Sequence, residues 1–309
     1  MIDFVGQKRW FFLISWILVI IGIASLIISQ VQLGTPLRLG TDFAGGTSMT
    51  LRFDPAVAQS QLRDEMARLG YVKVTVQGAG EGDFIIHTQE ITSDEAHQLA
   101  EELGAALDSQ VTISDYYLAS PTVGAEAARS AVIAVIVASI AMLFYIVWAF
   151  RRMPKSFRWG SCAVIALVHD VFITVGIFSL LGLLFGVEID ALFITGLLTV
   201  VGYSINNIVV VFDRIRENKA RGTSSDFAVT VNSSIVETLG RCLNTSLTTL
   251  FVILALFLFG GATIHYFVLV LLVGVIIGTY DSICVAGQLL VVWEKGEWSA
   301  LLPWAKRTA

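Results

Sequence analysis

Six stretches of the chain are apolar over lengths that suit a membrane-spanning helix. They cover residues 10–30, 127–150, 160–184, 190–212, 242–260 and 264–292. A transmembrane helix needs about 20 consecutive, mainly apolar residues, so this pattern predicts an all-α bundle of six transmembrane helices. Only residues 260–263 separate the last two stretches, and we expect that pair to form a tight helical hairpin.

The polar insertion between the first two stretches, residues 31–125, has a different periodicity. Some segments alternate apolar and polar residues, as β-strands do, and others have one apolar face at helical spacing. The expected strands are residues 47–53, 71–77, 83–88 and 110–118. The expected helices begin near Asp54 and at a capping box formed by Thr92 and Glu95. The order strand, helix, strand, strand, helix, strand predicts a small ferredoxin-like α+β domain.

A further segment, near residues 224–239, is too polar to span a membrane. Its residues Phe227, Val231, Ile235 and Leu239 recur every four positions, which predicts an amphipathic helix on the cytoplasmic surface. The chain is thereby divided into a first helix with its preceding residues, the insertion, the remaining five helices and a tail, at residues 1–30, 31–125, 126–293 and 294–309.

Composition agrees with a membrane protein, and the distribution of charge gives its orientation. The chain is 55% hydrophobic and 15% charged, whereas soluble domains are about 25% charged. Lys and Arg gather near both chain ends and in the loops 151–158 and 214–221, while the loops 185–189 and 260–263 have none. The positive-inside rule then places both termini in the cytoplasm and the insertion outside it. No nucleic-acid-binding motif is present, and the three cysteines are expected to be buried thiols.

Polar side chains interrupt the predicted membrane helices. Those that form the candidate site are Asp170, Tyr203, Asn206, Asn207, Arg241, Thr245, Thr248 and Asp281. Such groups cost free energy in lipid unless they face protein or water, and they therefore mark a functional site. The hydroxyls and amides could equally be hydrogen-bonding contacts between helices. A buried arginine and carboxylate that exchange partners as a proton binds and leaves would form a proton-coupled switch.

Other charged residues are expected to have simpler roles. Asp213 and Arg214 lie at the predicted cytoplasmic interface, where a role in topology and docking is expected. Glu188 and Asp190 lie in a short loop and are expected to be solvated. The sequence shows no nucleophile with a matching base, no metal-ligand spacing and no phosphate-binding loop. We therefore expect no enzymatic activity, no cofactor and no metal site.

Several motifs together resemble SecF, a subunit of the bacterial SecDF accessory complex of protein secretion. Residues 40–47 (GTDFAGGT) resemble the GxDFxGGT motif that follows the first helix of that family, with Asp42, Phe43, Gly45 and Gly46 in a turn that leads into the domain. The resemblance extends to the fourth helix (residues 202–206 and 209–218), the fifth (Arg241 and residues 245–250) and the third (His169 and Asp170).

This resemblance implies a resistance-nodulation-division type of fold, in which six helices form one half of a bundle and SecD supplies the other. It implies a multi-pass protein of the inner membrane that uses the proton gradient to assist the export of unfolded preproteins. The implied partners are SecD, the SecYEG channel, the SecA motor, YajC or YidC, and membrane lipid. Two alternatives stay open: a non-transducing scaffold that stabilises the translocon, and one half of a proton-driven small-molecule exporter.

Two residues depart from the family pattern. The family usually has an aspartate, held to carry the proton, where this chain has Asn207, and it tends to have serine where this chain has Asp281. An amide does not titrate in the physiological range. Three explanations are open. Asp281 could pack against Asn207, pair with Arg241 and take over the proton; Asn207 could have been introduced to trap one state; or the relay could rest on SecD.

Overall fold

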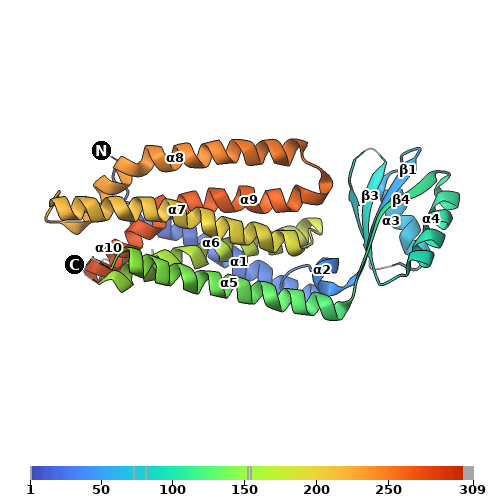
Figure 1. The fold of residues 1–309 in the computed structure, drawn as a ribbon, viewed down its shortest axis with the longest axis horizontal. Helices are drawn as coiled ribbons and strands as arrows, with labels where there is room; N and C mark the ends of the chain where they lie inside the picture. The colour runs from blue at the N-terminus through green and yellow to red at the C-terminus, as the bar shows by residue number, and fades with distance from the viewer. Residues whose placement is uncertain (1, 72–73, 81, 152, 154, 302–309) are drawn as a thin grey trace.

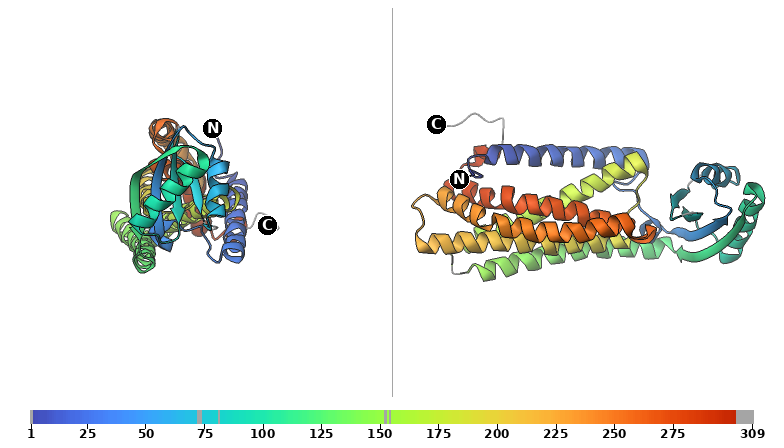
Figure 2. Two further views of the ribbon diagram at one scale, coloured as in Figure 1. Left: turned by 90° about the vertical axis from the view of Figure 1, so that its right-hand side faces the viewer. Right: turned by 90° about the horizontal axis from the view of Figure 1, so that it is seen from above.

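The computed structural model describes residues 2–301 except 72–73, 81, 152 and 154. Long helices run along the longest axis of the molecule, and a small sheet domain lies beyond one end of the bundle (Figure 1). The start of α1 and the end of α10 lie at the opposite end, which we call the distal end (Figures 1 and 2). Residues 302–309 of the predicted tail and two positions of the strand predicted at 71–77 lie outside the described residues.

The described part of the chain contains six helices that are long and apolar enough to cross a membrane, as the hydropathy pattern predicts. The first five are α1 (Lys8–Leu33), α5 (Pro121–Ala149), α6 (Ser156–Phe185), α7 (Ala191–Arg221) and α8 (Phe227–Phe259). The sixth consists of α9 (Ala262–Asp281), a π-helical turn (Ser282–Ala286) and α10 (Gly287–Lys295). A 3₁₀ turn (Trp298–Leu301) follows. The chain is therefore a multi-pass membrane protein.

Burial distinguishes the inner helices from the outer ones. Every residue from 281 to 292, which covers the π turn and most of α10, is buried. In contrast, α5 exposes large apolar side chains along its length, among them Ile136 and Phe144. Because lipid is as apolar as these side chains, such exposure is expected on a membrane-facing helix. The buried faces of α6, α7 and α9 thus form the interior in which polar groups can find partners.

The insertion folds into the predicted ferredoxin-like domain. Its elements are β1 (Gly46–Asp54), α3 (Gln59–Arg68), β2 (Thr75–Gly78), β3 (Asp83–Thr88), α4 (Ser93–Leu107) and β4 (Gln110–Ala119). The strands form an antiparallel sheet in the order β2-β3-β1-β4. Alternate residues of β1, including Leu51 and Phe53, pack against Leu62 of α3 and Leu103 of α4. Thr92 and Glu95 form the predicted capping box at the start of α4.

The structure differs from the separate surface helix expected near residues 224–239. This segment begins α8 and continues without a break through residues 240–259. Its apolar face packs against neighbouring helices, with Val231 and Ile235 fully buried and Phe227 and Leu239 partly buried. No proline interrupts the segment, and Gly240 is tolerated within a helix, so the backbone continues as a single helix.

A short polar segment connects the first helix to the domain. After α1, residues 34–40 lead into the single-turn helix α2 (Thr41–Ala44), and β1 follows directly. Gly45 and Gly46 have positive φ angles of 76° and 117°, and a Cβ at Gly46 would lie 2.4 Å from the Thr88 carbonyl oxygen. Only glycine adopts this turn without strain. Leu39 also forms a parallel bridge with Ile189, which ties the connection to the loop between α6 and α7.

Candidate proton-binding site in the helix bundle

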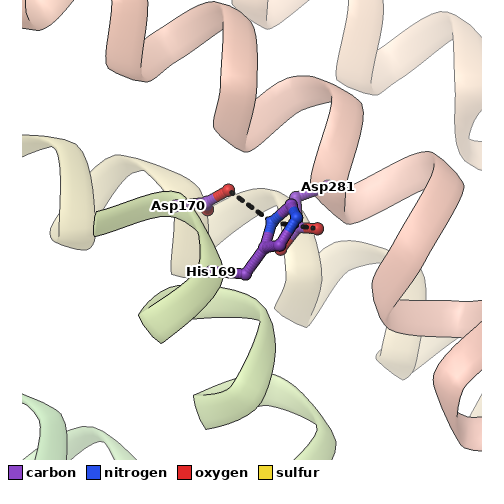
Figure 3. Close-up of side chains that lie close together, drawn as sticks. All are labelled: His169, Asp170 and Asp281. Atoms are coloured by element: carbon purple, nitrogen blue, oxygen red, sulfur yellow. Dashed lines mark ion pairs between the residues drawn. The ribbon is translucent and has the colours of Figure 1, made fainter. Parts of the chain in front are cut away.

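Three titratable side chains meet in the interior of the bundle (Figure 3). His169 and Asp170 come from α6, and Asp281 is the last residue of α9. Both aspartates are fully buried, and the His169 side chain is 13% exposed. His169 Nδ1 lies 3.2 Å from Asp281 Oδ1 and 4.0 Å from Asp170 Oδ1. One imidazole therefore contacts carboxylates that belong to two different helices.

Helix α7 completes the surroundings of this cluster. The Ser204 hydroxyl donates a hydrogen bond to Asp170 Oδ2. Close packing of α9 on α7 makes this arrangement possible, since a Cβ at Gly278 would lie 2.9 Å from the Ser204 Cβ. A Cβ at Gly274 would lie 2.1 Å from a methyl group of Val200. Small residues at helix contacts let backbones approach in this way, so the glycines set how close α9 can bring its carboxylate.

The cluster has more polar atoms than hydrogen bonds. Within the described residues, neither His169 nitrogen, neither Asp281 oxygen nor Asp170 Oδ1 has a partner with hydrogen-bond geometry. Burying an unpaired charge costs several kcal/mol, and an opposite charge or a proton reduces that cost. The net charge of the cluster changes from −2 to −1 to 0 as one and then two protons bind. Its electrostatic energy, and hence the attraction between α6 and α9, therefore depends on proton occupancy.

The same three residues have side chains of the kinds that bind metal ions. One ligand atom from each of His169, Asp170 and Asp281 lies within 4.8 Å of the others. A closed structural site for a metal such as zinc usually has four protein ligands, and an oxygen-ligated cation has six or more. Three residues fall short of both numbers. They equal the number of protein ligands in an open catalytic zinc site, whose fourth position is taken by a water or a substrate.

A second polar group surrounds Ser246 of α8. Tyr203 Oη, Asn207 Nδ2 and Thr279 Oγ1 lie within hydrogen-bond distance of Ser246 Oγ, at 3.1, 3.3 and 2.7 Å. These contacts join α7, α8 and α9. Asn206 lies on the exposed side of α7 and does not take part in this group. Tyr203 and Asn207 therefore belong to a hydrogen-bonding group distinct from the titratable cluster.

The remaining predicted residues of α8 face outward. Arg241, Thr245 and Thr248 are all exposed. The two threonine hydroxyls donate to carbonyls of their own helix, to Arg241 O and to Asn244 O, both at 2.9 Å. Arg241 forms no ion pair with any described residue, whereas Asp281 faces His169. The expected pairing of Asp281 with Arg241 is therefore wrong, because Asp281 is buried in the interior of the bundle while Arg241 is exposed on α8.

Asp213 and Arg214 lie in the distal part of α7 among ion pairs. Asp213 pairs with Arg216 at 2.5 Å on the same helix. Arg214 contacts Glu217 at 2.6 Å and also Glu237 of α8. These pairs are largely exposed and contribute little stability each. Of these three pairs, the contact between Arg214 and Glu237 joins the distal parts of α7 and α8.

The expectation that Glu188 is solvated is wrong. Its side chain is 11% exposed and lies between the bundle and the domain. Its carboxylate contacts Arg38 Nε at 3.5 Å and His87 Nδ1 of β3 at 2.6 Å, and it accepts a hydrogen bond from the hydroxyl of Thr75 in β2. Burial alone would raise the pKa of Glu188, but these partners outweigh burial and hold the pKa below its usual value. Asp190 is likewise partly buried and caps α7 by accepting from Phe193 N at 2.8 Å.

Three residues that form these two polar groups were not predicted as site residues from the sequence. His169 is present only as part of a motif, Ser204 is a single hydroxyl, and Ser246 lies in a run of similar residues. A histidine next to an aspartate in the middle of an apolar stretch was the available signal, because two adjacent titratable groups there need partners.

Comparison with known proteins relates the chain to subunits of the protein export machinery. Residues 99–296 match the family model for the C-terminal part of the protein export membrane proteins SecD and SecF, and residues 32–57 match the SecD/SecF GG motif. The chain is 41% identical to protein translocase subunit SecF of Thermobaculum terrenum, over 95% of this chain and 94% of that one. It is 39% identical to the same subunit of Anaerolinea thermophila, over 100% and 98% of the two chains.

A solved structure has the same architecture. The crystal structure of SecDF from Thermus thermophilus, described as a translocon-associated membrane protein, aligns with a TM-score of 0.82 at 33% identity. The alignment covers 95% of this chain and 39% of the SecDF chain, so this chain corresponds to well under half of that longer polypeptide. The six-helix bundle with an inserted sheet domain is thus an arrangement seen in a solved structure.

Proposed function

The chain belongs to the SecD/SecF family of protein export membrane proteins and is a SecF-type protein translocase subunit, and we propose that it couples proton movement to preprotein export. In this proposal it acts with a SecD-type partner. The domain lies outside the cytoplasm and both chain ends lie inside it, as the distribution of Lys and Arg indicates. The exported substrate is an unfolded preprotein that SecYEG and SecA deliver, with YajC or YidC as further members of the assembly.

The observation that carries the proposal is the buried cluster of His169, Asp170 and Asp281 (Figure 3). Two carboxylates in a site that excludes water repel each other unless a proton or an imidazolium lies between them. Loss of a proton therefore drives α6 and α9 apart, and its return draws them together. Among the described residues it is the group in which three His, Cys, Asp or Glu side chains meet closely, and both of its aspartates are fully buried between membrane helices.

The route from this cluster to the domain runs along α6. The loop that follows α6 contains Glu188, which contacts Arg38 and His87. A displacement of α6 relative to α9 would move this loop and the domain held on it. The contact of Glu188 with Arg38 and His87 would then transmit motion to the domain, and the proton occupancy of the cluster would change the force between α6 and α9.

The exposed polar face of α8 supports a partner within the membrane. Arg241, Thr245 and Thr248 would be costly next to lipid, because an arginine within a membrane-spanning helix needs water or protein. A second six-helix half that covers α8 would supply them with partners. The SecDF relative from Thermus thermophilus is a longer chain, and this chain matches 37% of it. The remainder of that sequence is long enough to include a second half of this kind.

The test is gradient-driven export by vesicles that contain this chain and its SecD-type partner. Asp281→Asn and Asp170→Asn remove the charge and nearly keep the volume, and we expect each to abolish the stimulation of export by a proton gradient. The matched control is Asn206→Ala, which alters an exposed position of α7 outside the cluster. Undiminished stimulation in the Asp281→Asn variant would favour the scaffold function instead.

A further inference from the structure

The helix that carries Asp281 contains an irregularity directly after it. Five residues, Ser282–Ala286, form a π-helical turn between α9 and α10. A π turn has i→i+5 hydrogen bonds in place of i→i+4 bonds, is rare, and occurs mostly as a single turn within α-helices, often at functional sites. All five residues are buried, so the turn lies inside the bundle and not at a frayed end.

The side chain of Gln288 supports this turn. It is fully buried, and its Nε2 donates to the carbonyl oxygen of Ile283 at 3.1 Å. At the end of a π turn one carbonyl loses the amide that would bond to it in an α-helix. A buried carbonyl without a partner is costly. The amide nitrogen of Gln288 thus gives a carbonyl of the turn a side-chain hydrogen bond, although Gln288 Oε1 is buried without a partner among the described residues.

The π turn determines which way Asp281 points. One additional residue in a helix rotates the following residues by about 100° relative to the preceding ones, because an α-helix has 3.6 residues per turn. Both flanking segments are packed, since a Cβ at Gly278 of α9 would lie 2.9 Å from Ser204 Cβ and one at Gly287 of α10 would lie 3.1 Å from Ile235 Cδ1. If the turn relaxed to an α-helix, the two segments would have to rotate relative to each other, and Asp281, at their junction, would shift relative to His169.

We propose that Gln288 is a positioning residue for the proton-binding cluster: by bonding to the Ile283 carbonyl it maintains the π turn that directs Asp281 toward His169 and Asp170. The expected effect of Gln288 on export rests on the proposed function. Its effect on the position of Asp281 does not. Gln288 contacts neither His169 nor the two aspartates, so it acts only through the backbone of the turn.

Replacement of Gln288 by methionine removes the donor and nearly keeps the volume. We expect Gln288→Met to reduce gradient-driven export several-fold and to shift the midpoint of its pH profile by about half a pH unit or more. We also expect the ¹⁵N resonances of the His169 imidazole in the purified protein to change, because the contact with Asp281 is lost. Unchanged His169 resonances and an unchanged pH midpoint would overturn the proposal, even if the variant were less stable.

A second variant keeps the test valid if Gln288→Met is poorly folded. Deletion of Cys284 removes one residue from the π turn and converts it to an α-helix, while Asp281 and α10 both keep their faces. In this deletion background the hydrogen bond from Gln288 to the Ile283 carbonyl is no longer needed. Gln288→Met should therefore leave the His169 resonances at their wild-type values. Persistence of the effect in the deletion background would overturn the proposal.

The outcome for Asp281→Asn separates the two proposals. If that variant exports normally while Gln288→Met changes the His169 resonances, the proposed function fails and the positioning role stands. If Asp281→Asn abolishes gradient-driven export while Gln288→Met changes neither the resonances nor the pH midpoint, the positioning role fails alone.

Discussion

His169 Nδ1 lies 3.2 Å from Asp281 Oδ1, and this contact joins α6 to α9 in the interior of the bundle. The two residues are 112 positions apart in the sequence, and only the packing of α9 against α6 and α7 brings them together. Asp170, on the same helix as His169, adds a second buried carboxylate. A proton at this cluster would therefore alter the force between helices and not only the charge of one residue.

Loss of the imidazole should destabilise the bundle. His169→Gln leaves two buried carboxylates without a cation, and we expect the free energy of unfolding in detergent to fall by about 3 kcal/mol at neutral pH. The loss should decrease at low pH, where the carboxylates become protonated. His97→Gln is the control, because His97 is exposed on the domain. Equal stability of His169→Gln and the control would contradict an ionic contact at this position.

Close packing at Gly278 should be necessary for the cluster. A methyl group there would lie 2.9 Å from the Ser204 Cβ, so Gly278→Ala should push α9 away from α7 and cost about 1–3 kcal/mol. Gly240→Ala is a matched control on α8, since a Cβ at Gly240 meets nothing within 4 Å. Thermal unfolding of the two variants in the same detergent makes the comparison. A larger loss at Gly240 than at Gly278 would count against tight packing of α9 on α7.

An aspartate at position 207 of α7, where the family usually has one, tests whether Asp281 has taken over its role in carrying the proton. Asp281→Ser should abolish gradient-driven export, and addition of Asn207→Asp should restore it at least in part. An aspartate at position 207 would be buried next to the Ser246 hydroxyl, which contacts Asn207 at 3.3 Å. The control is Asn207→Asp alone. If the double variant is as inactive as Asp281→Ser, the two positions are not equivalent and the relay is specific to the His169 cluster.

The contact between domain and bundle should weaken in acid. The pKa of Glu188 lies below its ordinary value of 4.5, held there by His87, Thr75 and Arg38 against the opposing effect of burial. A depressed pKa means that the contact contributes stability above about pH 4.5 and that this contribution is lost as the pH falls through the lower, folded value. The other charged and titratable groups around the nearby cavity of about 220 Å³ are Asp42, Asp115, Tyr117, Asp190 and Tyr266.

Distances between spin labels on the domain and on the α8–α9 turn would report this change. We expect a narrow distribution at neutral pH that broadens below about pH 4.5. Glu188→Gln should broaden it at all pH values, at a cost of roughly 1–3 kcal/mol. The control Glu90→Gln alters an exposed carboxylate of the domain. A wild-type distribution that does not respond to acid would exclude Glu188 as the group that holds the domain.

The sequence predicts the elements well because their signals are local. Apolar stretches of sufficient length determine the membrane helices, and the alternation of residues 47–53 and 83–88 determines strands of the domain. The ferredoxin-like order follows from the sequence of elements alone. The uninterrupted α8 could not be predicted by hydropathy, because a helix that leaves the membrane and packs on protein changes its polarity without changing its backbone.

The site depends on features that one sequence does not specify. Complete burial of Asp170 and Asp281 follows from their cost in lipid, and the structure agrees. The partner of Asp281 could not be predicted, because it depends on how far each helix is rotated about its axis. Here the π turn at Ser282–Ala286 shifts that rotation, and no local pattern in the sequence indicates a π turn. Arg241 was a reasonable partner by charge, but it lies on the exposed face of α8.

The most direct measurement of the central claim is an infrared titration of the carboxyl groups in the purified protein. The account predicts a protonated carboxyl C=O band that disappears reversibly as the pH rises. That band should be absent or displaced in both Asp281→Asn and Asp170→Asn, and it should shift in His169→Gln. Identical pH-dependent carboxyl bands in the wild type and Asp281→Asn would contradict proton binding at this cluster.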